Sequence, residues 1–166
     1  LRLTTDNQVA LNLKVGKIPV AFTELPDQPI QLWMKQVSPK FGGRAEMNTL
    51  AHVLGLTASD IDPNVPIEEV STGFPTLIVP LLSLAALKRI KINKEAYFAL
   101  VNTAWAKVIL AFSRQGYKEH QQLSARVFAD YYGIAEDAAT GSSNGSLAAY
   151  LERHKLFGAS NINVRV

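Results

Sequence analysis

Near its carboxyl end the chain reads Glu136-Asp137-Ala138-Ala139-Thr140-Gly141-Ser142-Ser143-Asn144-Gly145, and this stretch decides how the rest is interpreted. Small residues lead from an extended run into a helix that is expected from about Ser142 to Leu156. Apolar residues at helical spacing give that helix one buried face: Leu147, Tyr150 and Leu151. Because its other faces carry small residues, we expect a sheet to wrap around it.

The first turn of this helix has the composition of an anion-binding site. Unpaired N–H groups and the positive end of the helix dipole lie there. Gly141 allows close approach to the backbone, while Ser142 and Ser143 add hydroxyl donors. Asp137, four residues before Gly141, is placed to accept a proton or to orient a bound group. An ordinary capped helix, with Thr140 or Ser142 as its cap, explains the same residues, so composition leaves both interpretations open.

The rest of the chain alternates between short strands and short helices. Strands are expected at 9–15, 18–22, 30–37, in two pieces within 67–79, and at 107–112, 125–128 and 161–166. Helices are expected at 46–54, 84–90 and 94–103, with Gly55, Ser83 and Asn93 as caps and a capping box at 57–60. Strands dominate without a strict βαβ rhythm, so we expect an α+β fold with a mainly antiparallel sheet.

Three local expectations complete this assignment. Pro39, Gly42 and Gly43 indicate a loop, and Gly158 is expected to end the long helix. Two tryptophans, Trp33 and Trp105, are expected in the core.

The composition limits the classes of function. Charged residues make up 19% of the 166, below the roughly 25% of typical soluble domains. Either a well-filled core or a surface that faces a partner explains the deficit. The net charge of +3 is mild and dispersed, which argues against a nucleic-acid partner. No apolar run reaches the ~18 residues of a membrane span, and we expect a cytoplasmic protein that does not bind membranes.

The sequence offers no sign of a metal site. It contains no cysteine, which excludes disulfides and thiolate ligands within the chain. The three histidines, His52, His120 and His154, have no paired acidic or cysteine ligands at suitable spacing. His154 is interpreted as a solvated cation near the carboxyl end of the long helix.

Longer segments around the opening stretch carry a family resemblance. Arg126-Val127-Phe128-Ala129, followed by the run from Gly133 to Leu151, resembles the PhzF-like (phenazine biosynthesis-like) family. That family reads R-x-F-A, then G-I-x-E-D-P-A-T-G-S-A, then a Leu-Ala-x-Tyr helix; Ala138 stands at the position of the usual proline. Further similarity covers Trp33-Met34-Lys35-Gln36 and the run from Val70 to Leu81, so the resemblance extends over nearly the whole chain.

The resemblance implies a fold related to diaminopimelate epimerase. In that fold, two similar lobes each wrap mostly antiparallel strands around a central helix, and the active site lies between the two helix amino ends. Residues 1–15 resemble the end of a missing amino-terminal lobe, and residues 16–166 resemble the carboxy-terminal lobe without its final strands. The same resemblance implies an isomerase that uses no cofactor and moves a proton on a small carboxylic acid. We also expect a homodimer.

The resemblance also assigns roles to individual residues. Asp137 matches the aspartate that contacts the substrate, and Gly141 and Ser142 match residues that hold it. We therefore expect Asp137 and Ser142 to be catalytic, with substrate bound by Thr140, Gly141, Ser142 and Ser143. Gly73 is a further candidate, as a position where a ligand approaches the backbone.

One part of the family's machinery has no counterpart in this chain. The principal acid/base of the family is a glutamate in the amino-terminal lobe. We therefore expect catalysis from the intact protein and not from this chain alone. A carboxylate-binding protein of the same fold that has lost catalysis is the alternative.

Overall fold

The computed structural model describes residues 6–24, 26, 29–138 and 140–158, and the chain divides into two compact units, Leu1–Ser38 and Pro39–Val166. The strand expected at 161–166 lies outside the described residues. The division predicted between residues 15 and 16 is instead the expected boundary between an amino-terminal lobe and the carboxy-terminal lobe. It stays a prediction. In the structure this point falls in the turn of a hairpin.

The first unit is a three-stranded antiparallel sheet in the order β1 (Gln8–Leu13), β2 (Gly16–Thr23), β3 (Gln31–Met34). Its register places only apolar side chains on one face: Val9, Leu11, Leu13, Ile18, Val20, Phe22, Leu32 and Met34. Trp33 lies on the opposite face and is 61% exposed, so its expected place in the core is wrong. Alternation along the strand decides its side, because both its neighbours occupy the apolar face.

The second unit is built on a six-stranded sheet. Its strands, in spatial order, are β4 (Lys40–Arg44), β5 (Glu68–Ser71), β6 (Thr76–Leu81), β7 (Val108–Ser113), β8 (Ser124–Ala129) and β9 (Ile134–Asp137). Neighbouring strands are antiparallel except β6 and β7, which are parallel. A parallel pair needs a long crossover, and α2 (Leu84–Arg89) and α3 (Lys94–Thr103) lie within it. The mainly antiparallel α+β fold is confirmed, with this one parallel pair added.

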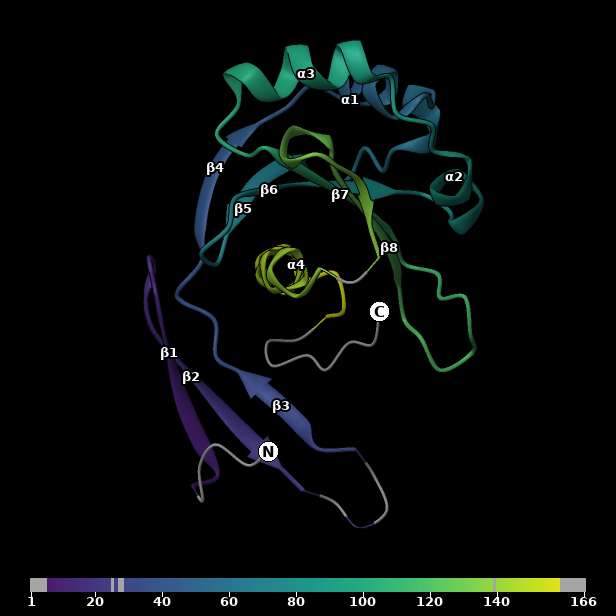
Figure 1. The fold of residues 1–166 in the computed structure, drawn as a ribbon. Helices are drawn as coiled ribbons and strands as arrows, with labels where there is room; N and C mark the ends of the chain where they lie inside the picture. Colours follow the sequence, from purple (N-terminus) through teal and green to yellow (C-terminus); the bar gives the residue numbers. More distant parts are fainter. Residues whose placement is uncertain (1–5, 25, 27–28, 139, 159–166) are drawn as a thin grey trace. The chain divides into compact units, whose positions relative to one another are not determined.

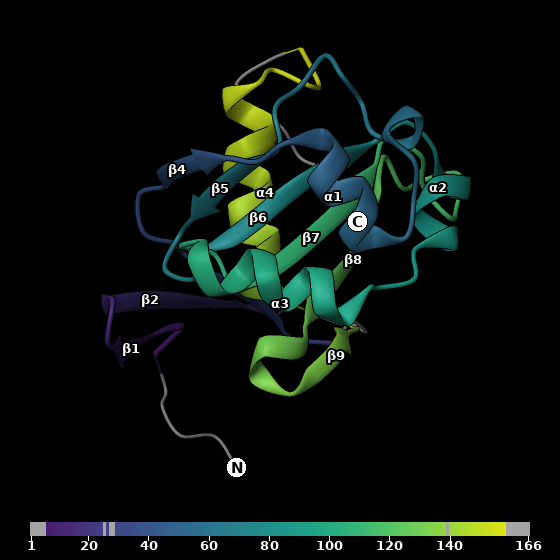
Figure 2. The same cartoon turned by 90° about the horizontal axis from the view of Figure 1, so that it is seen from above.

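The two faces of this sheet support two separate cores. Strand β7 shows the division, because Ile109 and Ala111 join the core beneath α1 (Met47–Leu54), α2 and α3. Its alternate residues Val108, Leu110 and Phe112 join the core around α4 (Gly141–Arg153). The curved sheet arches over α4 in Figure 1, and Figure 2 shows α1 and α3 in front of the sheet with α4 behind it. The expected central helix, wrapped by strands, is confirmed.

Local helix signals in the sequence are also confirmed. The side chain of Ser83 accepts a hydrogen bond from the Ala86 N–H, and Asn93 does the same for Ala96. Gly55 ends α1 in the left-handed conformation, with φ of 64°. A capping box closes the short 3-10 turn η1 (Ala58–Asp60).

The loop expected around Gly42 and Gly43 is wrong, because residues 40–44 form the edge strand β4. The reason is close packing. A Cβ atom at Gly42 would lie 2.8 Å from Glu69 Oε2 and 2.8 Å from Trp105 Cε3. Glycine is therefore required there by its neighbours and does not mark a turn. Trp105 itself is 44% exposed, so it is not the core residue that was expected.

The long helix ends at Arg153, earlier than the expected end at Leu156, and Gly158 does not stop it. Lys155 adopts a left-handed φ of 51°. Its N–H donates to the Glu152 carbonyl, and the N–H of Leu156 donates to the Leu151 carbonyl. This pair of bonds is a Schellman motif, which a lysine here forms in place of the usual glycine.

Replacement of Leu147 by alanine should destabilise the second unit strongly. Leu147 is only 1% exposed and packs in the core around α4. We expect the Leu147→Ala variant to lose about 2–5 kcal/mol of unfolding free energy, measured by urea denaturation. Leu82→Ala is the matched control, because Leu82 is 51% exposed, and it should change stability by no more than about 0.5 kcal/mol. Similar losses in both variants would contradict this core.

Candidate active site

Strand β9 brings Asp137 to the start of α4, and one ion pair holds that strand in place. Arg126 on β8 donates from Nε and Nη2 to the two carboxylate oxygens of Glu136, each at 2.7 Å. Its Nη1 also donates to the carbonyls of Leu87 and Ile90, where α2 ends. Such a two-pronged pair fixes direction as well as distance. Because Asp137 is the next residue along β9, its position depends on this pair.

The ion pair also alters the acidity of its members. The hydrogen bonds from Arg126 lower the pKa of Glu136, against a smaller opposing effect of burial. The same bonds raise the pKa of Arg126. The pair therefore remains charged to a lower pH than an isolated glutamate would allow.

The start of α4 keeps its backbone donors without a side-chain cap. Thr140 occupies the cap position with an extended backbone, but its side chain makes no capping hydrogen bond. Its hydroxyl donates instead to Oδ2 of Asp137. The helix α1 also begins without a side-chain cap, so a missing cap alone does not indicate a binding site. At α4 the missing cap is combined with Asp137 and with Gly141. The capped-helix interpretation of Thr140 does not describe this arrangement.

Gly141 and Ser142 form the accessible part of this helix start. Gly141 is exposed, and among the described residues a Cβ atom built on it would meet no atom within 4 Å beyond its chain neighbours and its own helix backbone. Ser142 is half-buried. The backbone at Gly141 is therefore open to a ligand, and nothing within the described chain fills that space.

Ser143 and Ser146 turn inward and fasten α4 to the sheet. Ser143 is buried, and the Thr76 hydroxyl donates to its oxygen at 3.2 Å. Ser146 is also buried, with its hydroxyl 3.5 Å from the carbonyl of Phe74. The hydroxyl of Ser143 is thus bonded within the protein, which favours a positioning role over direct contact with a ligand.

Gly73 lies in the turn between β5 and β6 that these serines contact. Its φ of 125° is in the region that favours glycine, and its N–H donates to the hydroxyl of Ser71 at 3.1 Å. The following residues of the turn, Phe74 and Thr76, meet Ser146 and Ser143 of α4. The structure therefore places the Gly73 turn beside the first two turns of α4.

The opposite end of α4 is closed by a buried acidic contact. His154 Nε2 lies 2.9 Å from Oε2 of Glu68, and Arg153 lies at 4.0 Å from Oε1. The hydroxyl of Tyr150 donates to the Pro66 carbonyl at 2.7 Å, and burial raises the pKa of Tyr150. The interpretation of His154 as a solvated cation is wrong, because Glu68 and the ring of Tyr150 half-bury it.

Other kinds of site find no support among the residues that the structure describes. No three histidine, cysteine or acidic side chains gather there as a metal would require. Within the same residues, no helix has both the length and the apolar composition to cross a bilayer.

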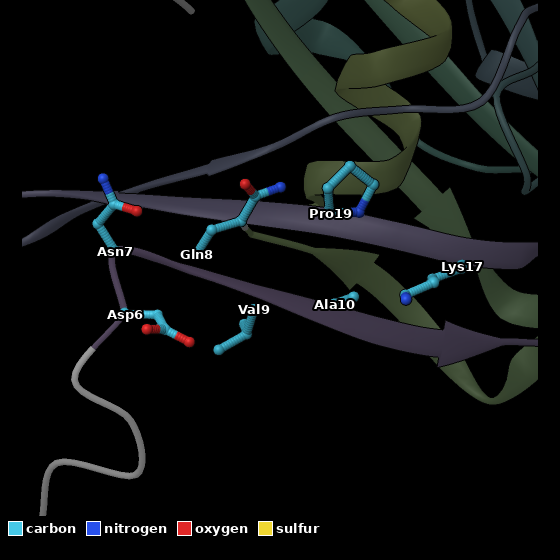
Figure 3. Close-up of a pocket in the computed structure, with 7 residues that line it drawn as sticks. All are labelled: Asp6, Asn7, Gln8, Val9, Ala10, Lys17 and Pro19. Carbon is cyan, nitrogen blue, oxygen red and sulfur yellow. The ribbon is translucent and has the colours of Figure 1, made fainter.

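A hollow also lies on the β1–β2 hairpin of the first unit (Figure 3). The hollow is lined by Asp6, Asn7, Gln8, Val9, Ala10, Lys17 and Pro19. None of these is a predicted site residue.

Comparison with known proteins places this chain in a family. Residues 1–165 match the family described as phenazine biosynthesis-like protein. The chain belongs to the PhzF-like family. Its fold is that of diaminopimelate epimerase-like proteins, and a crystal structure of the Bacillus anthracis PhzF-family protein matches it with a TM-score of 0.78. That match has 30% sequence identity and covers 90% of this chain and 50% of the other.

Two curated relatives carry isomerase names. An uncharacterized isomerase, YfhB of Bacillus subtilis, is 33% identical over 155 residues, which cover 92% of this chain and 52% of the relative. The trans-2,3-dihydro-3-hydroxyanthranilate isomerase of Pseudomonas aeruginosa is 29% identical over 152 residues, 92% of this chain and 50% of the relative. The chain therefore spans about half the length of these relatives.

The sequence predicts the start of α4, but the ion pair that holds β9 beside it was not predicted. Glu136 lies in β9 and pairs with Arg126. The available signal in the sequence was the positive charge of Arg126, ten residues before Glu136 and across a short hairpin from it. The bond from Thr140 to Asp137 had no such signal, because the same threonine fits a helix cap equally well.

Glu136→Gln should weaken the second unit in a pH-dependent way. Because folding lowers the pKa of Glu136, the ion pair stabilises the protein fully above the ordinary glutamate pKa of 4.5. This contribution disappears as the pH falls through the lowered pKa. Since Glu136 is half-exposed, we expect a deficit of about 1 kcal/mol or less at pH ~7 that is smaller at an acidic pH below the ordinary glutamate pKa of 4.5.

Urea unfolding of both proteins at the two pH values measures this difference. Glu119→Gln, at an exposed loop position, is the charge-matched control and should show no such trend. A deficit of equal size at both pH values would contradict the assigned role of the pair.

Proposed function

We propose that the intact protein is a cofactor-independent isomerase that moves a proton on a small carboxylic acid. The observation that carries the proposal is the uncapped start of α4, where Asp137 lies beside the open backbone of Gly141. Membership of the PhzF-like family and the isomerase names of its relatives support the same reaction class.

Each residue has a distinct part in this proposal. The N–H groups of Gly141 and Ser142 bind the substrate carboxylate at the positive end of the helix. The hydroxyl of Ser142 adds a further donor. Thr140 orients the carboxylate of Asp137, which handles the proton of the substrate or holds its amino or hydroxyl group. Ser143 and the Gly73 turn position the helix start from beneath.

The opposing acid/base is proposed to come from the amino-terminal lobe, as the resemblance implies. The name of the Pseudomonas relative indicates a hydroxylated, ring-containing amino acid as its substrate. We propose a carboxylate of comparable size for this protein. A homodimer and a cytoplasmic location stay predictions.

A carboxylate-binding protein without catalysis is the second candidate. One observation favours it: the hydroxyl of Thr140 donates to Asp137, so this carboxylate is already engaged in a hydrogen bond and fixed in direction. In that case Asp137 would orient the ligand and accept no proton.

Deuterium uptake distinguishes these two functions. The intact protein is incubated in D2O with trans-2,3-dihydro-3-hydroxyanthranilate, and deuterium in the recovered compound is followed by mass spectrometry. We expect uptake that falls by at least about 100-fold in Asp137→Asn, since general acid/base catalysis supplies factors of that size. Glu119→Gln should exchange at the wild-type rate. Equal rates for wild type and Asp137→Asn would refute the role of Asp137, and binding without any uptake would favour the second candidate.

Gly141→Ala should separate ligand binding from stability. Because a Cβ atom at Gly141 meets no protein atom, the variant should keep or gain stability, by up to about 1 kcal/mol. The added methyl group occupies the space proposed for the carboxylate, so affinity for anthranilate should fall about tenfold in an NMR titration. Unchanged affinity together with unchanged stability would argue against a carboxylate at this position.

A further inference from the structure

A group of aromatic rings, with Tyr131 and Tyr132 exposed and Phe74 half-buried, lies on the two segments that border the candidate site. The ring of Tyr132 is 5.5 Å from that of Phe74 and 5.2 Å from that of Tyr131, measured between centroids. Tyr132 is 51% exposed, so the core does not account for it. Its place beside Phe74 leaves apolar ring surface open to solvent.

Both rings are connected to the start of α4. Phe74 directly follows Gly73, and its carbonyl lies 3.5 Å from the hydroxyl of Ser146 in the second turn of that helix. Tyr132 ends the short 3-10 turn η2 (Asp130–Tyr132), which leads into β9 and so to Asp137. The contact between Phe74 and Tyr132 thus connects the turn between β5 and β6, which lies beside the start of α4, to strand β9, which carries Asp137.

The turn that carries Tyr132 is held firmly by neighbouring elements. Lys94 of α3 pairs with Asp130 at 3.0 Å. The hydroxyl of Tyr97 accepts from the Tyr131 N–H at 3.2 Å and donates to the Lys107 carbonyl at 2.6 Å. Gly133 closes the turn with a φ of 78°. An exposed ring on such a turn is preorganised, so contact with a ligand costs little conformational entropy.

We propose that Phe74 and Tyr132 form an apolar wall that selects a flat, unsaturated ring on the carboxylate bound at α4. This inference rests on the proposed function, because it takes the carboxylate position from Gly141 and Asp137. Aromatic faces favour flat unsaturated partners over flexible chains of equal charge. Tyr132 and Phe74 are therefore specificity residues, and Asp137 and Gly141 provide the anchor that every carboxylate shares.

Two ligands that differ only in the ring test this proposal. Benzoate and propanoate carry the same single negative charge on the same carboxylate group, but only benzoate carries an aromatic ring. Their affinities are measured by NMR titration of wild type, Tyr132→Ala, Tyr132→Phe and Gly141→Ala. Tyr117→Ala is the matched control, because Tyr117 is an equally exposed tyrosine in the loop at the far end of β7.

We expect Tyr132→Ala to weaken the binding of benzoate by about three- to tenfold and to leave that of propanoate unchanged. Tyr132→Phe should retain wild-type affinity for both, and Gly141→Ala should weaken both. If Tyr132→Ala lowers the affinity for both ligands equally, or for neither, the proposed aromatic wall is wrong while the proposed function stands. A change of oligomeric state in that variant with unchanged affinities would assign the ring to a protein interface and would likewise overturn the wall. Absence of binding by either ligand to wild type would overturn both proposals.

Discussion

The burial of α4 against the curved sheet is the constraint on which the rest of the second unit depends. Leu147, Tyr150 and Leu151 fill the core on that face, and buried serines attach the helix to the turn before β6. A helix enclosed in this way must satisfy its terminal backbone groups locally. Its carboxyl end does so through the bonds of Lys155 and Leu156. Its amino end makes no side-chain cap, and this difference between the two ends defines the candidate site.

Electrostatic contacts connect that helix start to distant elements. Arg126 joins β9 to β8 through Glu136 and reaches two carbonyls at the end of α2. On the other side, Asp130 and Tyr97 tie the turn before β9 to α3. Strand β9 is short and lies at the edge of the sheet, so few backbone bonds hold it. The side-chain contacts compensate for the small number of backbone hydrogen bonds on β9. They position Asp137 although no buried core lies beneath it.

Much of this architecture could be predicted from the sequence because its signals are local. Ser83, Asn93 and Gly55 act within one turn of chain, and the apolar spacing in α4 reports its buried face directly. Strand β4 could not be predicted, since Gly42 is required by Trp105 and Glu69, which are remote in sequence. Likewise, the motif predicted Asp137 and Gly141 as neighbours. Whether Thr140 caps the helix or bonds to Asp137 depends on the path of β9, which no local pattern encodes.

Under the two proposals, the sequence between the matching motif segments is a place where specificity could vary. Asp130, Tyr131 and Tyr132 lie between Ala129, where the first segment ends, and Gly133, where the second begins. The motif therefore constrains the anchor for a carboxylate and leaves the turn that carries the exposed rings unspecified. A change at Tyr132 alters the surface of this turn and leaves the ion pairs of Asp130 and Arg126 in place. Under the two proposals, such a division would allow one scaffold to accept different acids, because the backbone of the helix start would recognise the carboxylate and the adjoining turn would recognise the shape of the ligand.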